Sequence, residues 1–148
     1  MKYLATITAL LFCLISYSQA DRIVGFWLDD SGEGQIQIYK ATDGKYYGKI
    51  VWLIDYKRNK LDDKNPDEKL RSRKVQGLVI VSKLTYNADD KEWTDGLIYD
   101  PKSGSSYDSY AWFEDNNFDE LHLKGFVMGM RFIGRTTIWK REKEKRKE

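Results

Sequence analysis

The stretch that decides the fold is Gln35-Ile36-Gln37-Ile38-Tyr39-Lys40-Ala41-Thr42-Asp43-Gly44-Lys45-Tyr46-Tyr47-Gly48-Lys49-Ile50. Its first part, 35–40, alternates polar and apolar side chains with the period that is typical of a β-strand with one buried face. Asp43-Gly44 follows, and both residue types tolerate the positive φ that a two-residue hairpin turn requires. The segment 46–54 is rich in Tyr, Val, Ile and Trp and is the expected partner strand. The stretch therefore predicts an antiparallel β-hairpin.

Six further strands are expected on either side of this hairpin. Turn sequences such as Asp29-Asp30-Ser31-Gly32 and Asp100-Pro101-Lys102-Ser103-Gly104 separate them, with proline and glycine where tight turns favour these residues. One short helix is expected in the long polar segment after 54, with Asn65 as its N-cap and Pro66 in its first turn. The further strands are predicted at 22–28, 77–86, 92–100, 107–113, 118–126 and 130–140.

The predicted fold class is therefore all-β. Short antiparallel neighbours at this spacing form a sandwich or a barrel. We expect a single antiparallel up-and-down β-barrel of about eight strands, with the short helix in the long loop after the third strand. Closure removes the exposed strand edges of a sheet. An open sandwich is the alternative.

The composition narrows the class of protein. The chain has 148 residues, of which 32% are charged and 14% aromatic, and its mean hydropathy is −0.64. These values are typical of one folded domain and exclude both a multi-span membrane protein and a disordered chain. The net charge is +2, from 25 Lys and Arg against 23 Asp and Glu, so no nucleic-acid partner is expected. We expect a monomer.

Residues 1–20 have the layout of a secretory signal peptide. A positive start is followed by the mostly apolar segment 3–17, and Ser18 and Ala20 place small residues at the −3 and −1 positions of a cleavage site after Ala20. The apolar run is short for a membrane span, although an uncleaved anchor is the alternative. We therefore expect a secreted or periplasmic protein without a transmembrane span after cleavage. Cys13 is the only cysteine, so the mature chain has neither disulfides nor a thiol nucleophile.

Two short motifs resemble a pair found in lipocalins and other calycins: Gly25-Phe26-Trp27 in the first strand and Gly134-Arg135-Thr136 in the last. In that family the tryptophan packs under a last-strand arginine, so the resemblance implies that Gly25, Trp27 and Arg135 close the barrel. A longer series of motifs, over about residues 22–141, resembles a bacterial secreted family known as domain of unknown function 2147. That family carries no established reaction, so the resemblance implies a small secreted β-domain and no particular activity. The further motifs are Gly48-Lys49-Ile50-Val51-Trp52-Leu53, Asn65-Pro66-Asp67, Leu70-Arg71-Ser72-Arg73 and Gly96-Leu97-Ile98-Tyr99-Asp100-Pro101.

No sequence pattern indicates a catalytic or metal site, and no cofactor is expected. The single histidine, His122, alternates with Glu120 and Lys124, so we expect it to face solvent; a functional role is the alternative. No G-x-S-x-G elbow accompanies it. Residues 63–67 have the spacing of a calcium loop, but Pro66 interrupts it and a helix start explains it better. Zinc is disfavoured because cysteine and histidine do not cluster.

Arginines and tyrosines are the candidate ligand-binding residues. An inward-facing arginine needs either a carboxylate of the protein or an anionic ligand, because a lone buried charge is very costly. Internal pairing with Asp67, Asp95 or Asp100 is the alternative. The candidate set, expected near one mouth of the barrel, is Arg71, Arg73, Tyr99, Tyr107 and Arg131.

The predicted domain limits are 1–20 for the signal peptide, 21–140 for the barrel and 141–148 for a charged tail. From Lys140 onward the chain carries six basic and three acidic residues. We expect this end to be a solvated extension, with a weak contact to an anionic surface as the alternative.

Three functions remain open at this point. The first is an extracytoplasmic barrel that binds a small amphiphilic or anionic ligand, which the aromatic content favours. The second is a structural or interaction module of the cell envelope whose lumen its own side chains fill. The third is a hydrolase using paired carboxylates such as Asp55, Asp67 or Asp100, although abundant acids are weak evidence for one. We expect a binding protein and not an enzyme.

Overall fold

The hairpin of residues 35–50 forms as expected. Strand β2 (Gly34–Lys40) pairs antiparallel with β3 (Tyr46–Leu53), with Ile38 opposite Gly48. The turn differs in detail from the prediction. The Ala41 N–H donates to the Lys45 carbonyl at 2.8 Å, so three residues form the loop, and only Gly44 among them has a positive φ, of 80°. This is the common hairpin loop in which a left-handed residue follows a type I turn.

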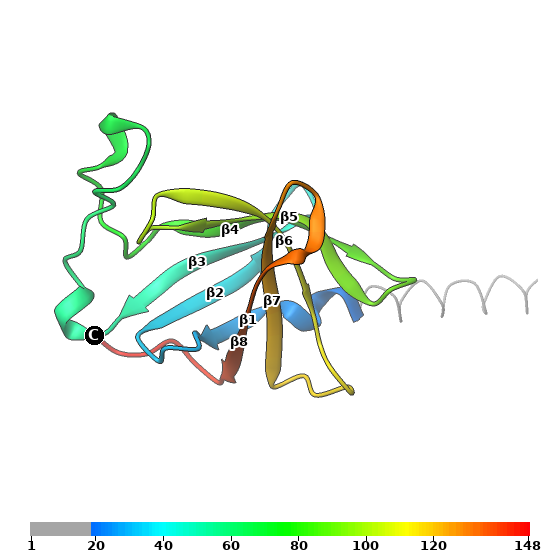
Figure 1. Ribbon diagram of the computed structural model, residues 1–148. Coiled ribbons are helices and arrows are strands. Elements are labelled where there is room, and N and C mark those ends of the chain that lie inside the picture. The colour runs from blue at the N-terminus through cyan, green and yellow to red at the C-terminus, as the bar shows by residue number, and fades with distance from the viewer. Residues whose placement is uncertain (1–18) are drawn as a thin grey trace, which may run out of the picture.

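Eight antiparallel strands close into a barrel in the computed structural model, which describes residues 19–148 (Figure 1). Each strand pairs with the next, and β1 pairs with β8, so the closed barrel is confirmed and the open sandwich is not formed. Most of the predicted signal peptide, with Cys13, lies outside the described residues. Within 19–148, no helix is long and apolar enough to cross a membrane. The remaining strands are β1 Gly25–Leu28, β4 Val79–Asn87, β5 Glu92–Asp100, β6 Ser105–Trp112, β7 Glu120–Val127 and β8 Met130–Glu142.

An aromatic cluster fills one end of the barrel. The rings of Trp27 and Phe113 lie 6.0 Å apart, and Trp93 packs edge-on against Phe113 at 5.4 Å. Phe118 adds a second edge-on contact to Phe113, at 5.3 Å. Both tryptophans are almost completely buried. Edge-to-face pairs at these distances are favourable beyond the area that they bury, so this end is a packed core.

Trp27 and Arg141 close the seam between β1 and β8, which corrects the prediction that Arg135 contacts the tryptophan. The Arg141 guanidinium lies 4.1 Å above the Trp27 ring. The side chain of Arg135 is 84% exposed and lies 3.6 Å from Asp30. The physical reason is the length of β8, which meets β1 only through residues 140–142. The arginine that pairs with Trp27 is therefore Arg141, near the C-terminal end of β8.

Gly25 and Trp27 both serve this seam. Gly25 has φ of 144°, and a Cβ there would lie 2.8 Å from Nη1 of Arg141, so a side chain would collide with the guanidinium. The half-buried guanidinium of Arg141 is satisfied by the ring and by backbone acceptors. Its guanidinium donates hydrogen bonds of 2.6 to 3.1 Å to the carbonyls of Arg22, Val24 and Phe118.

The expected short helix is present only as a 3₁₀ turn, η3 (Glu68–Leu70), preceded in the same loop by η2 (Asp55–Lys57). Its N-cap is Asp67, whose carboxylate accepts a hydrogen bond from the Lys69 N–H at 3.0 Å. Asn65, the predicted cap, lies ahead of this turn: its side-chain oxygen accepts from the Asp67 N–H at 2.9 Å, and its amide nitrogen donates to the buried residue Asp62. A third 3₁₀ turn, η1 (Asp21–Ile23), precedes β1.

The charged tail packs against the barrel, and β8 continues into it as far as Glu142, beyond the predicted domain limit. Gln35 is fully buried beneath the tail. Its amide donates to Glu142 at 2.7 Å, and its carbonyl oxygen accepts from the backbone N–H of Arg146 at 3.0 Å. Arg146 also lies 4.8 Å over the Trp52 ring. The tail is therefore part of the outer surface of the barrel.

Candidate functional site

The end of the barrel opposite the aromatic cluster opens into a cavity of about 570 Å³. Four connections surround the opening, those between β1 and β2, β3 and β4, β5 and β6, and β7 and β8. A cavity of this size is in the range of small-molecule sites, which are mostly apolar with a few polar groups. The apolar wall includes Ile36, Ile50, Leu53, Ile80, Ile98 and Leu123.

Two tyrosines and one threonine add polar atoms to the wall of the cavity. Tyr99 and Tyr107 both line it, as expected of ligand-facing residues. The Tyr99 hydroxyl is engaged by the protein, because it donates to Asp62 at 2.5 Å. Thr137 donates to the Leu123 carbonyl at 3.4 Å. Among the described residues no hydrogen bond engages the Tyr107 hydroxyl, so Tyr107 is the tyrosine of the wall that remains available to a ligand.

Pairing within the rim neutralises several of its charges. Lys57 and the Tyr56 hydroxyl both donate to Glu33. The hydrogen bonds from Lys57 and Tyr56 lower the pKa of Glu33 to about 2. Arg135 and Asp30 form a longer pair, at 3.6 Å, beside the seam between β8 and β1. Both carboxylates therefore already have cationic partners.

The other two carboxylates of the rim, those of Asp29 and Asp100, accept hydrogen bonds within their own turns. Asp29 accepts from the Ser31 hydroxyl at 2.9 Å and from the Glu33 N–H at 3.0 Å. Asp100 accepts from the backbone N–H of Lys102 at 2.9 Å. Within the described residues, the ammonium groups of Lys60 and Lys102 have no carboxylate within ion-pair distance. The rim therefore presents cations that are free to meet an anionic group.

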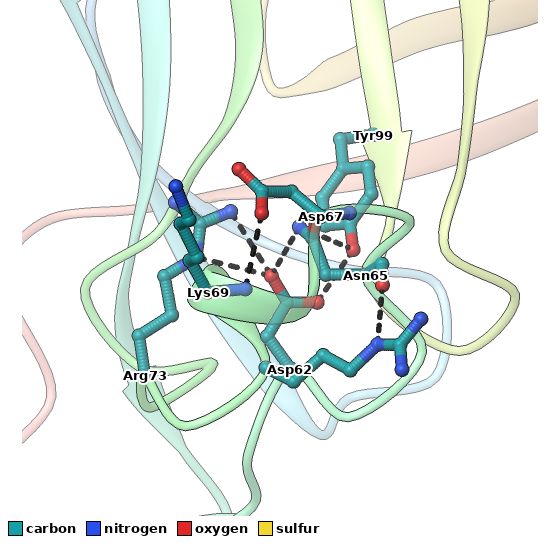
Figure 2. Close-up of polar contacts among 7 residues, drawn as sticks. Asp62, Asn65, Asp67, Lys69, Arg73 and Tyr99 are labelled. Carbon is teal, nitrogen blue, oxygen red and sulfur yellow. Dashed lines mark hydrogen bonds and ion pairs between the residues drawn. The ribbon is translucent and has the colours of Figure 1, made fainter.

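Figure 2 shows the polar cluster around Asp62 that ties the loop between β3 and β4 to β5. Asp62 is fully buried. Its carboxylate accepts from Tyr99 at 2.5 Å, from Asn65 at 2.8 Å and from Arg73 at 3.0 Å and 3.1 Å. A buried carboxylate needs such donors because it cannot reach water. The cluster thus holds the loop as a fixed wall beside the opening.

The hydrogen bonds set the ionisation of this cluster. Burial alone would raise the pKa of Asp62, but the bonds from Tyr99, Asn65 and Arg73 outweigh it and hold that pKa below its ordinary value. Burial and the bond to Asp62 raise the pKa of Tyr99 to about 12. At neutral pH the cluster therefore contains a carboxylate and a neutral phenol.

A close backbone approach gives the loop a second anchor. Gly104, in the turn between β5 and β6, has φ of 74°, and a Cβ there would lie 1.9 Å from the Lys64 carbonyl oxygen. Only glycine allows both the left-handed conformation and this contact. The loop is consequently held at Asp62 and at Lys64.

Three of the five candidate ligand residues lie away from the cavity wall. Arg73 braces Asp62, and the Arg71 Nε donates to the Asn65 carbonyl at 2.8 Å, so both arginines support the loop. Arg131 lies on the outer surface, 4.0 Å over the Tyr110 ring and 2.7 Å from Glu92. Internal pairing, the alternative to a ligand role, therefore describes the contacts of these three arginines, but the acidic partners are Asp62, Glu68 and Glu92 and not the predicted Asp67, Asp95 or Asp100.

His122 is buried, which corrects the expectation of a solvent-facing side chain. Only 8% of the residue is exposed. It points away from the core, as the alternation predicts, but the Trp112 ring covers it at a centroid distance of 5.2 Å. Its Nε2 lies 3.9 Å from Glu114. The large aromatic neighbour on β6, which the pattern of β7 alone does not reveal, explains the difference.

The carboxylates considered for hydrolysis each serve local structure. Asp55 pairs with Arg58 at 2.5 Å, and Asp67 caps η3. Asp100 organises the turn after β5. Each of the three therefore has a local structural contact of its own.

Sequence reasoning missed Lys60, Lys102 and Arg135 as residues of the opening. A usable signal was present for Lys102. In an up-and-down barrel, alternate connections lie at the same end, so the turns after β1 and β5 must share one end. Lys60 depends on the fold of a long loop, which no periodicity describes.

The closed eight-stranded barrel with one open end has a lipocalin-like fold. A similar solved structure is titled "Protein HP1028 from the human pathogen Helicobacter pylori belongs to the lipocalin family", with a TM-score of 0.70 and 23% identity over 82% of this chain and 83% of that one. This likeness shows the fold. The chain belongs to the family described as an uncharacterized protein conserved in bacteria (DUF2147), whose model matches residues 25–141, so the predicted family is confirmed. No curated protein matches the chain.

Proposed function

We propose that the protein binds one small amphiphilic or anionic ligand inside its barrel. The observation that carries this proposal is the cavity of about 570 Å³ with its mostly apolar wall and single open end. Apolar pockets with a few placed polar groups are the usual form of small-ligand sites. The open volume favours this function over a structural barrel whose lumen is filled by its own side chains.

The distribution of polar groups gives the ligand an orientation. The apolar part of the ligand lies among Ile98, Leu123 and their neighbours, and the Tyr107 hydroxyl offers one hydrogen bond along the wall. An anionic head group lies at the rim near Lys60 and Lys102. Charge-assisted hydrogen bonds to these ammonium groups are stronger than neutral ones, so the rim selects against a cationic head group.

Filling the cavity tests this function. The Ile98→Trp variant places an indole in the lumen, and we expect the affinity for the anionic amphiphile anilinonaphthalene sulfonate to fall about tenfold or more. The matched control is Leu97→Trp, at the next position of β5, which does not line the cavity and is 39% exposed. Fluorescence titration measures both affinities. Equal affinities in folded Ile98→Trp and Leu97→Trp proteins would show that the probe binds elsewhere and would end the proposal.

We also propose that the protein is exported, is cleaved after Ala20 and works as a monomer in the periplasm or outside the cell. The support is the small residues Ser18 and Ala20 that follow an apolar run. We expect N-terminal sequencing of the protein from the host's extracytoplasmic fraction to begin at Asp21. An Ala20→Leu variant should accumulate in the uncleaved form. Recovery of the wild-type chain from the cytoplasm with Met1 in place would contradict export.

A further inference from the structure

The turn between β7 and β8 exposes a cluster of large apolar side chains. Met128 and Phe132 are each 79% exposed, and Ile133 is 43% exposed. Figure 1 shows this turn, in orange, projecting from the barrel. Contiguous apolar side chains at a projecting tip are unusual on a soluble surface and mark a contact site.

The turn chemistry does not explain the methionine. Val127 pairs with Met130, so the turn has two residues, Met128 with φ of 56° and Gly129 with φ of 69°. Two positive φ values define the type I′ turn, in which asparagine or aspartate is favoured before glycine. A methionine in this conformation is uncommon and carries a conformational cost. Asparagine would suit the turn better, so the apolar side chain serves another purpose.

A bulge in β8 adds to the exposure. The register moves from Phe126 opposite Gly134 to Val127 opposite Met130, so residues 131–133 have no partners in β7. Bulges re-aim side chains and are frequent next to functional sites. Here the bulge contains Phe132 and Ile133, which are exposed beside the turn.

A basic loop borders the same opening. Lys60, Val127 and Ile133 all line the mouth of the cavity, which places the loop between β3 and β4 on the same end as the apolar tip. Residues 55–76 of that loop contain eight Lys and Arg against five Asp and Glu, a net charge of +3. The basic tail also ends there, since Glu148 accepts from the Gln76 side chain at 2.8 Å.

We infer that the open end of the barrel docks on an anionic lipid surface, with Met128 and Phe132 inserted among the lipid chains and the basic loop against the head groups. Apolar insertion and electrostatic attraction to anionic lipids act together in interfacial binding. This inference goes beyond ligand binding, because it concerns the outer surface and holds whether or not the cavity is occupied. The sequence suggested the charged tail as a contact for an anionic surface. The inference assigns that contact to the whole open end of the barrel.

Vesicle binding tests the inference, with protein that begins at Asp21 so that the apolar segment before it cannot bind lipid. η1 begins at this residue and all eight strands follow it, and a cooperative thermal melt is required of every variant. We expect co-sedimentation with phosphatidylglycerol vesicles, weaker binding to phosphatidylcholine vesicles, and a loss of binding at high salt. Phe132→Ser should weaken binding about tenfold, from lost burial of one aromatic side chain.

Met128→Asn separates a lipid contact from a folding role. The substitution improves the turn, so the melting temperature should stay the same or rise while vesicle binding falls. The control is Ile138→Ser, which removes an apolar side chain of 40% exposure that does not line the opening, and should bind like the wild type.

Three results would overturn the inference. The first is unchanged vesicle binding in folded Phe132→Ser and Met128→Asn proteins. The second is equal binding to both lipids. The third is concentration-dependent dimerisation that the same two substitutions abolish without any vesicle binding, which would assign the tip to a second copy of the chain. Anilinonaphthalene sulfonate titration without vesicles reports on the cavity separately, so failure of one proposal is distinguishable from failure of the other.

Discussion

Replacing Trp27 with alanine is expected to lower the free energy of unfolding by about 3–5 kcal/mol, the range for loss of a large buried aromatic side chain. Trp27 is fully buried, contacts Phe113 at 6.0 Å and lies beneath Arg141. Its removal leaves a cavity in the aromatic cluster and takes the ring from under the guanidinium. Urea unfolding followed by circular dichroism measures the change.

The two arginines of β8 make this prediction specific to the seam. Arg141→Ala should cost about 2–3 kcal/mol, because it removes the cation above Trp27 and a set of charge-assisted hydrogen bonds. Arg135→Ala should cost well under about 1 kcal/mol, as expected for an exposed pair at 3.6 Å. Equal losses in the two arginine variants would contradict the assignment of Arg141 to the seam.

Removal of the Asp62 carboxylate is the second large expected effect. Asp62→Ala should lower the free energy of unfolding by about 2–3 kcal/mol, because Tyr99 and Asn65 lose a buried charged acceptor. The partial exposure of Arg73 limits the cost, since its guanidinium can turn to water. Tyr99→Phe is the matched control: it removes one of the bonds to the carboxylate and should cost less than Asp62→Ala.

The same carboxylate predicts a direction of pH dependence. Its pKa in the folded protein lies below the ordinary value of 3.8. Its contribution to stability is therefore complete above the unfolded pKa and disappears as pH falls through the folded pKa. Between about pH 5 and pH 3, the wild type should lose more stability than Asp62→Asn. If the free energy of unfolding changed with pH by the same amount in both proteins, Asp62 would not stabilise the loop as a carboxylate.

The number and order of the strands could be predicted because local patterns carry them. Alternation over 35–40 and turn sequences such as 100–104 depend on neighbouring residues alone, and both recur in the structure. Closure of the barrel could be predicted from the series of eight short antiparallel strands, together with the resemblance of Gly25 and Trp27 to the lipocalin motif. The expected helix is reduced to the turn η3, which begins after Asp67; the Asn65 side-chain oxygen accepts from the Asp67 N–H at 2.9 Å, one turn ahead of η3.

The level of each arginine along β8 could not be predicted. Arg135 and Arg141 have the same parity in the strand, so alternation places both toward the lumen without stating how deep each one lies. That depth depends on the register of β1 against β8, which joins Phe26 to Glu142. Arg131 is displaced further by the bulge at residues 131–133, which has no signature in the apolar pattern. For this reason the sequence predicted arginines at the mouth and at the seam but assigned the wrong ones. Arg141 lies at the seam, where Arg135 was expected, and Arg135 lies at the mouth.

Pairing of β1 with β8 also dictates when the molecule can fold. The seam joins the first strand to the last residues of the domain, and closing so long a loop is slow because its entropy is lost before the contacts form. A chain still emerging from a ribosome lacks residues 140–142 and leaves the edge of β1 unpaired. Final closure must therefore wait until residues 140–142 have left the ribosome, so that the barrel closes only after nearly the whole domain has been synthesised.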